Sequence, residues 1–443
     1  MDGHRHYRLR SFIRLILPAL FMTGALGFAA TALADSDDEP ISYSTAPVND
    51  PIARFQKRLD AGEAKLDFDP KHGYLESALK NLKISASSQA LVFSKTSFQR
   101  NLISPSKPRA LYFSDDVYVG TVRDGTVLEV ASIDPHQGTI FYTLKQEETK
   151  RPRFVRQTYD CTQCHESGMT RGVPGLLLRS VFPDSQGQPI FTAGTFATTD
   201  RSPLSERWGG WYVTGSCGRQ RHMGNVTIDD EAHAEQTDFG PTSNVTSLAK
   251  IVNTTPYLRD TSDIVALLVF GHQQNLHNLI TRANYDVRVT MRDSEALNKA
   301  LGEPPGHRSE STEHRIQNAC EPLVRAILFS GEAKLSDVVT GTSGFTREFS
   351  AQGPRDSRGR SLRDFDLTGR IFKYPCSYLI YSEQFDGLPP EARDYVYRRL
   401  WEVLDGDDPG KAFAHLSDKD RRAIVQILRD TKKNLPAYWK RKS

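Results

Sequence analysis

The stretch RALYFSDDVYVGTVRDGTVLEVASIDPHQGTIFYTLKQ, residues 109–146, decides the fold. It is rich in Val, Phe, Tyr and Thr, and short segments with Asp and Gly divide it into separate runs. Such runs between turn residues are typical of antiparallel strands. Together with ALVFSKTSF at residues 90–98, the stretch predicts a meander of about four strands.

The β pattern continues beyond this meander. RSVFPDSQGQPIFTAGTF, residues 179–196, has two apolar runs around the turn residues 184–187, which predicts a hairpin. RWGGWYVTG, residues 207–215, predicts one more strand.

The second half of the chain has the pattern of helices. Residues 261–289 start with the cap candidates Thr261 and Ser262 and then run apolar without a strong breaker, which predicts a long helix. Two further helices are predicted near the C-terminus: 388–406, with Pro390 in its first turn and Gly406 at its end, and 416–430, with Ser417 as N-cap and Asp420 three residues later.

The N-terminus has the pattern of an export signal. Basic RHYRLRSFIR at residues 5–14 precedes an apolar run that ends on Ala32-Leu33-Ala34, a small-x-small site for cleavage after Ala34. The alternative is an uncleaved transmembrane anchor, because the run is long enough to cross a bilayer. Cleavage is favoured, so we expect a periplasmic protein with no membrane span after the signal is removed.

Composition narrows the class of partner. Lys and Arg number 57 and Asp and Glu number 54, without a long basic tract, so nucleic acid is not an expected partner. Five cysteines are too few for a disulfide scaffold in a chain of this size, and an odd number leaves at least one unpaired.

Two of these cysteines lie in TYDCTQCHESGM, residues 158–169, where Cys161 and Cys164 are followed directly by His165. Two residues between the thiols let both sulfurs reach one edge of a porphyrin and form thioethers with its vinyl groups. A histidine directly after the second cysteine can then lie under that edge as the proximal iron ligand. The spacing therefore predicts one covalently attached haem c.

Two other chemistries use paired cysteines. A zinc clip needs more ligands at metal-like spacing, and Cys217, Cys320 and Cys376 each stand alone. A redox disulfide is expected at the start of a helix within a βαβ unit, which this region does not resemble. Both alternatives remain open, as does a disulfide of Cys217 with Cys320 or Cys376, but the export signal favours haem.

Through CTQCH, the chain resembles the c-type cytochromes. Strand-like sequence follows the motif, so the chain is more similar to large exported single-haem proteins of the cytochrome type than to small helical ones. The resemblance implies electron transfer with a periplasmic redox partner protein. The alternative is a haem c-dependent oxidoreductase whose distal side is open to a small substrate, which the length of the chain favours.

The sixth ligand of the iron would decide between these functions. His272 is the first candidate and Met223 the second, although a histidine on an apolar helix face is more often a core residue satisfied by a hydrogen bond. Arg219 and Arg221 could pair with haem propionates. The remaining candidates for the ligand are His222, His277 and Met169.

These observations predict an α+β protein with a β-rich N-terminal portion and a mainly helical C-terminal portion. The expected segments are a signal peptide (1–34), a flexible tether (35–55), a β-rich domain (56–150), a haem c-binding region (151–300) and a helical C-terminal region (301–443).

Overall fold

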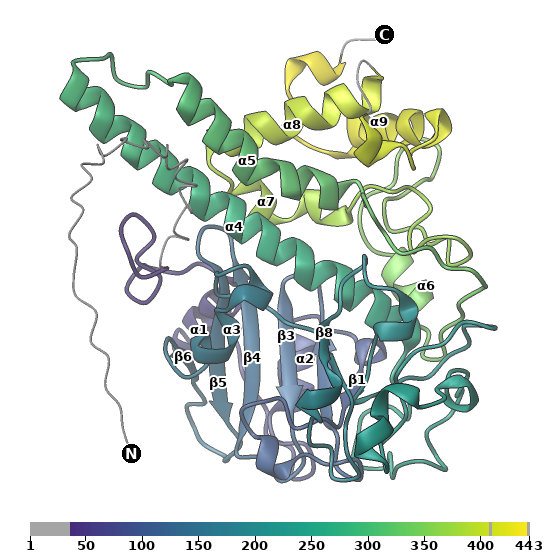
Figure 1. The fold of residues 1–443 in the computed structure, drawn as a ribbon. Helices are drawn as coiled ribbons and strands as arrows, with labels where there is room; N and C mark the ends of the chain where they lie inside the picture. Colours follow the sequence, from purple (N-terminus) through teal and green to yellow (C-terminus); the bar gives the residue numbers. More distant parts are fainter. Residues whose placement is uncertain (1–35, 407–409, 441–443) are drawn as a thin grey trace, which may run out of the picture. The chain divides into compact units, whose positions relative to one another are not determined.

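The β-rich part of the chain forms one antiparallel sheet of seven strands, in the order β6-β5-β4-β3-β2-β1-β9 (Figure 1). The computed structural model describes residues 36–406 and 410–440, so the expected signal peptide lies outside the described residues. The predicted meander and the α+β class are confirmed. The strands are β1 (Ala90–Val92), β2 (Arg109–Phe113), β3 (Val117–Thr121), β4 (Val127–Asp134), β5 (Gly138–Lys145), β6 (Phe154–Gln157) and β9 (Trp211–Tyr212).

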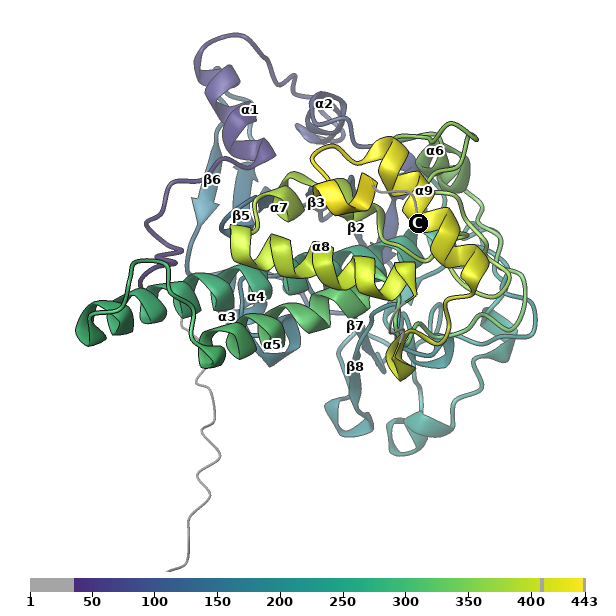
Figure 2. The same cartoon turned by 90° about the horizontal axis from the view of Figure 1, so that it is seen from above.

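Alternate residues of this sheet face two different cores, as the pleat of a strand requires. In β4, Leu128 and Val130 pack in a core shared with α1 (Pro51–Asp60) and α2 (Leu75–Asn81). Ala131 and Ile133 of the same strand pack in the core formed with α4 (Ile264–Leu301). The sheet therefore has α1 and α2 on one side and α4 on the other (Figure 2).

The long helix α4 (Ile264–Leu301) confirms the prediction for residues 261–289 and continues beyond it. Its N-cap is Asp263, one residue after the predicted cap candidates. Ser262 instead joins the edge of the sheet, where its hydroxyl donates to the carbonyl of Tyr212 at 2.6 Å and accepts the N–H of Leu91 at 2.9 Å. The start of α4 is thus joined to strands β1 and β9 by the side chain next to the cap.

The C-terminal helices pack on α4 and on each other. The helix α5 (Glu310–Ile327) folds back along α4 (Figure 1). It contacts α8 (Pro390–Asp405), which in turn contacts α9 (Asp418–Thr431). The predicted C-terminal end of α8 at Gly406 and the predicted capping box of α9 at Ser417 are confirmed. The helix α5 is not predicted by the sequence. The remaining elements are α3 (Thr162–His165), α5 (Glu310–Ile327), α6 (Phe345–Ser350), α7 (Glu383–Asp386), α8 (Pro390–Asp405), α9 (Asp418–Thr431), β7 (Arg179–Val181) and β8 (Thr195–Ala197).

Residues 36–55, expected to be a flexible tether, are packed against the sheet instead. Ile41 and Tyr43 are buried, and the Tyr43 hydroxyl donates to the carbonyl of Thr139 at 2.8 Å. The polar composition of this segment suggested a linker, but apolar burial and hydrogen bonds hold it: Asp50 accepts the Tyr142 hydroxyl at 2.6 Å, and the Asn49 N–H donates to Asp134 at 2.6 Å.

The expected segments 56–150 and 151–300 share one sheet, because β6 and β9 belong to the second segment and pair with β5 and β1 of the first. The two β7–β8 strands form a separate ribbon at the predicted hairpin. Among the described residues, no helix combines the length and the apolar character needed to cross a bilayer.

Candidate functional site

The motif of two cysteines and a histidine forms the one-turn helix α3, which follows the edge strand β6 (Figure 1). Cys161 is the N-cap of this turn and is partly buried, whereas Cys164 is exposed. All five cysteines of the chain are free thiols. The structure therefore places the three residues that the sequence predicts to act together on one turn of helix.

The His165 side chain is held by the backbone of Gly175. Its Nδ1 donates to the carbonyl of Gly175 at 2.9 Å, and the N–H of Gly175 donates to the His165 carbonyl at 2.8 Å. The imidazole packs against Phe141 of β5, with 4.9 Å between the ring centres. Because Nδ1 carries the proton, Nε2 keeps its lone pair, and no described residue forms a hydrogen bond with it.

The imidazole of His165 is kept neutral by its surroundings. Burial lowers its pKa below the ordinary value, and Arg109 lowers it further, although the Gly175 hydrogen bond acts in the opposite direction. A neutral imidazole with an available nitrogen is the form that binds a metal ion.

An ion pair on the sheet lies beside the motif. The Arg109 guanidinium of β2 contacts the Glu129 carboxylate of β4 at 2.5 Å, and both side chains are mostly buried. The guanidinium occupies the space over Gly120 of β3, where a Cβ atom would overlap it. The Nε of Arg109 is buried without a hydrogen-bond partner.

This environment disfavours the thiolate of Cys161. Burial is the main cause that raises the pKa of its thiol, to about 11, and the charges of Glu129 and Asp160 add to the effect. Attacking cysteines of redox disulfides have lowered pKa values, since the thiolate is the nucleophile. The surroundings of Cys161 are therefore opposite to those of a redox-active pair.

Replacing Glu129 by glutamine is expected to lower the pKa of the Cys161 thiol, because the change removes a negative charge and leaves Arg109 uncompensated. In a Cys164→Ala background without haem, alkylation of Cys161 at about pH 9 should become several-fold faster. Asp160→Asn is the control, because it removes an exposed negative charge near Cys161. It should increase the alkylation rate less than Glu129→Gln does. An alkylation rate that does not change in the Glu129 variant would contradict this account.

The two first candidates for the sixth ligand are engaged elsewhere. His272 lies in the core, where its Nε2 is 2.8 Å from the Ser377 hydroxyl and its ring stacks on Phe329. The sulfur of Met223 is buried and accepts the Ser180 hydroxyl at 3.6 Å. Neither side chain has a hydrogen bond or ring contact with the His165 side chain in the described part of the chain.

The other candidate residues are bonded to other partners or are exposed. The two ring nitrogens of His277 lie 2.7 Å from Gln384 and 2.8 Å from the carbonyl of Asp115. Arg219 is exposed beside Asp337, and the guanidinium of Arg221 donates to the Arg219 carbonyl. Met169 lies next to the motif in sequence and is exposed.

Protonation of His222 is expected to destabilise the fold as the pH falls. Its Nδ1 accepts the Gly224 N–H at 3.1 Å and its Nε2 lies 3.1 Å from the Ser243 carbonyl, while burial lowers its pKa to about 4. An unfolded histidine has a pKa of about 6.5. Between about pH 6.5 and pH 4 the unfolded chain binds more protons than the folded one, so the free energy of unfolding should fall by up to about 3 kcal/mol.

Urea unfolding of the wild type and of His222→Gln at neutral and acid pH measures this effect. The variant should lose less stability on acidification than the wild type. His165 and His277 have pKa values lowered in the same direction and remain in both proteins, so the difference between the two isolates His222. An identical acid dependence in the two proteins would contradict the assignment.

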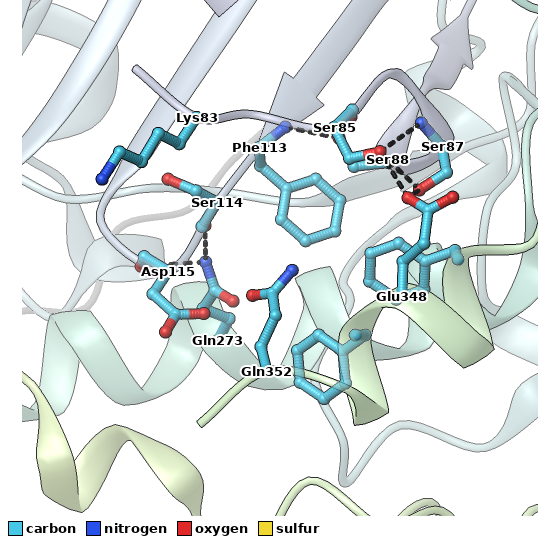
Figure 3. A pocket seen from close by; sticks show the side chains of 12 residues that line it. Lys83, Ser85, Ser87, Ser88, Phe113, Ser114, Asp115, Gln273, Glu348 and Gln352 are labelled. Carbon is cyan, nitrogen blue, oxygen red and sulfur yellow. Dashed lines mark hydrogen bonds between the residues drawn. The ribbon is translucent and has the colours of Figure 1, made fainter. Parts of the chain in front are cut away.

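A small pocket is lined by Phe113, Ser114 and Asp115 at the turn between β2 and β3 and by residues of other segments (Figure 3). Its volume is about 30 Å³, which is room for about one water molecule. The hydroxyls of Ser85 and Ser87 donate to the Glu348 carboxylate at 2.6 and 2.7 Å, so these three side chains are bonded to one another. None of the motif residues lines this pocket.

Comparisons of the chain with protein-family models, with curated proteins and with solved structures returned no match. The residues of the site must therefore carry any functional argument. Sequence reasoning found Cys161, Cys164 and His165 but assigned no role in the site to Gly175 or to the Arg109–Glu129 pair. The Pro174-Gly175 pair ten residues after the histidine was the available signal for the first, and no local signal marks the ion pair.

Proposed function

We propose that this chain is an exported monohaem protein of the c type, with thioether bonds from Cys161 and Cys164 and with His165 as the proximal iron ligand. When bound, the haem would supply reversible one-electron chemistry at its iron. The single observation that supports this most is the hydrogen bond from Nδ1 of His165 to the Gly175 carbonyl. Histidines that bind metals usually donate their other ring N–H in this way, which orients the ring and raises its basicity.

Exposed apolar side chains around the motif also fit a porphyrin. Val155, Tyr159 and Met169 lie within a few residues of α3, and all three are exposed large apolar residues. Large exposed apolar patches mark binding sites, and these three residues are the candidates for such a surface beside the motif. A porphyrin has apolar faces that these side chains could cover.

The donor set fits haem better than the two alternatives. Cys161, Cys164 and His165 do not belong to any group of three clustered ligand atoms from His, Cys, Asp or Glu among residues 36–406 and 410–440. A structural zinc site holds four such ligands together. The raised pKa of the Cys161 thiol argues against a redox disulfide.

Electron transfer with a periplasmic redox partner protein is the first function that follows from this proposal. Cys164 is exposed, so the edge of the porphyrin bound to it would lie near the protein surface. A partner protein could approach this edge without a change in the fold. The chain has 57 basic and 54 acidic residues, so its net charge does not favour a strongly charged partner.

A haem-dependent oxidoreductase is the second candidate, and one observation favours it. The side chains of His272 and Met223, expected as distal ligands, are engaged in separate cores. A sixth position without a protein ligand would be open to a small substrate. The absorption spectrum separates the two functions, since a low-spin iron in both oxidation states indicates a filled position and a high-spin iron an open one.

The experiment that tests the shared proposal is a pyridine haemochrome spectrum of the full chain, made in a host with working cytochrome c maturation. A c-type spectrum is expected. If the purified protein holds no haem although the host matures another c-type cytochrome, the proposal is overturned.

A further inference from the structure

Asn278 on α4 holds the backbone that contacts His165. Its Oδ1 accepts the N–H of Leu176 at 2.9 Å, and its Nδ2 donates to the carbonyl of the same residue at 2.7 Å. Leu176 directly follows Gly175, the hydrogen-bond partner of His165. The Asn278 side chain is buried, so water does not compete for these two bonds.

The contact is also close enough to restrict the residue at position 175. A Cβ atom on Gly175 would overlap the Oδ1 of Asn278 and would lie 3.2 Å from the Cβ of Thr170. Only glycine lets the backbone approach the helix at this distance. The segment is therefore held on one side by α4 and on the other by the two hydrogen bonds to His165.

The helix that carries Asn278 is itself firmly placed. Asp263 caps the first turn of α4, and the buried residues of α4 pack on the sheet and on α5. The neighbouring residue His277 is fixed by Gln384 and by the Asp115 carbonyl. A displacement of the Gly175 carbonyl would thus have to break the bonds to Asn278 rather than move the helix.

We propose that Asn278 is a positioning residue for His165: it clamps the backbone of residues 175 and 176 so that the Gly175 carbonyl faces Nδ1. The clamp selects the tautomer with the proton on Nδ1 and leaves the Nε2 lone pair available. The clamp itself needs no haem, but its role as support for an iron ligand rests on the proposed function. Asn278 does not contact the reacting atoms, so its effect passes through the histidine.

The test compares Asn278→Ala with Asn284→Ala. Asn284 is a matched control because it lies on the same helix, is equally buried and donates to the Gly387 carbonyl instead of the motif segment. Both variants lose a buried amide, and Asn278→Ala should lose the more stability, because Asn278 makes two hydrogen bonds and Asn284 one of 3.3 Å. Only Asn278→Ala is expected to raise the reduction potential of the haem, because a looser Nδ1 hydrogen bond makes the imidazole a weaker donor to oxidised iron.

A second measurement does not depend on haem. In the chain made without haem maturation and labelled with ¹⁵N-histidine, His165 should give the signal of a single Nδ1–H tautomer, identified by its loss in His165→Gln. The Asn278→Ala variant should show a mixture of tautomers, whereas Asn284→Ala should keep the single form.

The two measurements distinguish the possible failures. If haem never attaches, the proposed function fails, and the tautomer of the haem-free chain alone decides the role of Asn278. If haem attaches and Asn278→Ala has the same potential and the same tautomer as Asn284→Ala, the positioning role is overturned while the haem proposal stands.

Discussion

Replacing Asp263 by alanine is expected to lower the free energy of unfolding by about 4 kcal/mol. The carboxylate is fully buried, and each of its oxygens accepts two backbone N–H groups. Oδ1 caps α4 by accepting from Val265 at 2.8 Å and from Ala266 at 3.3 Å. Oδ2 accepts from Thr342 and from Ser343, both at 2.7 Å.

The expected loss is large because four backbone N–H donors would lose their acceptor at once, and those of Val265 and Ala266 are buried. The Ser343 hydroxyl, which donates to Oδ2 at 2.9 Å, would lose it as well. An unpaired buried donor costs about 1–3 kcal/mol, and water that enters the site would recover part of this. Urea unfolding followed by circular dichroism measures the change. Ser417→Ala is the matched control: it removes the exposed N-cap of α9 and should cost only about 1 kcal/mol. Equal losses in the two variants would show that Asp263 is an ordinary cap.

Replacing both Cys161 and Cys164 by alanine is expected to remove all covalently bound haem from the protein. The thioethers would be the covalent attachment, and no other cysteine pair of the chain has the same spacing. The fold should persist, because Cys164 is exposed and Cys161 is only partly buried in a one-turn helix. Haem staining of a denaturing gel measures the loss.

The matched control is Cys217→Ala, which removes a thiol that is buried far along the chain and donates to the Ser243 carbonyl at 3.2 Å. This variant should lose some stability and keep its haem. Haem that stays covalently bound in the Cys161→Ala/Cys164→Ala double variant would contradict the assignment of the motif.

The sequence predicts those parts of the fold in which local pattern and tertiary environment agree. The meander at 109–146 alternates between two cores, and α8 and α9 carry their own end signals at Gly406 and Ser417. The helix α5 escapes prediction because charged residues and Pro322 interrupt its apolar positions. The strand β6 is four residues long with an exposed Val155, so its pairing with β5 defines it.

The candidate site likewise has residues that local sequence indicates and residues that only tertiary packing brings in. Cys161, Cys164 and His165 are neighbours in sequence, so their spacing alone brings them together. Asn278 meets Leu176 across 102 positions of the chain, and its contact arises only when α4 packs on the segment after α3. The helical pattern places His272 on an apolar face but does not indicate which residues pack against it. Its neighbours Ser377 and Phe329 come from distant parts of the sequence.

The most direct test of the central claim is the intact mass of the wild-type protein purified from the periplasm of a host with cytochrome c maturation, together with the mass of its proteolytic peptide spanning residues 158–169. The account predicts the chain cleaved after Ala34 plus the mass of one haem, with that haem on the peptide. A mass without haem, or a peptide with two free thiols from a host that matures other c-type cytochromes, would contradict the account.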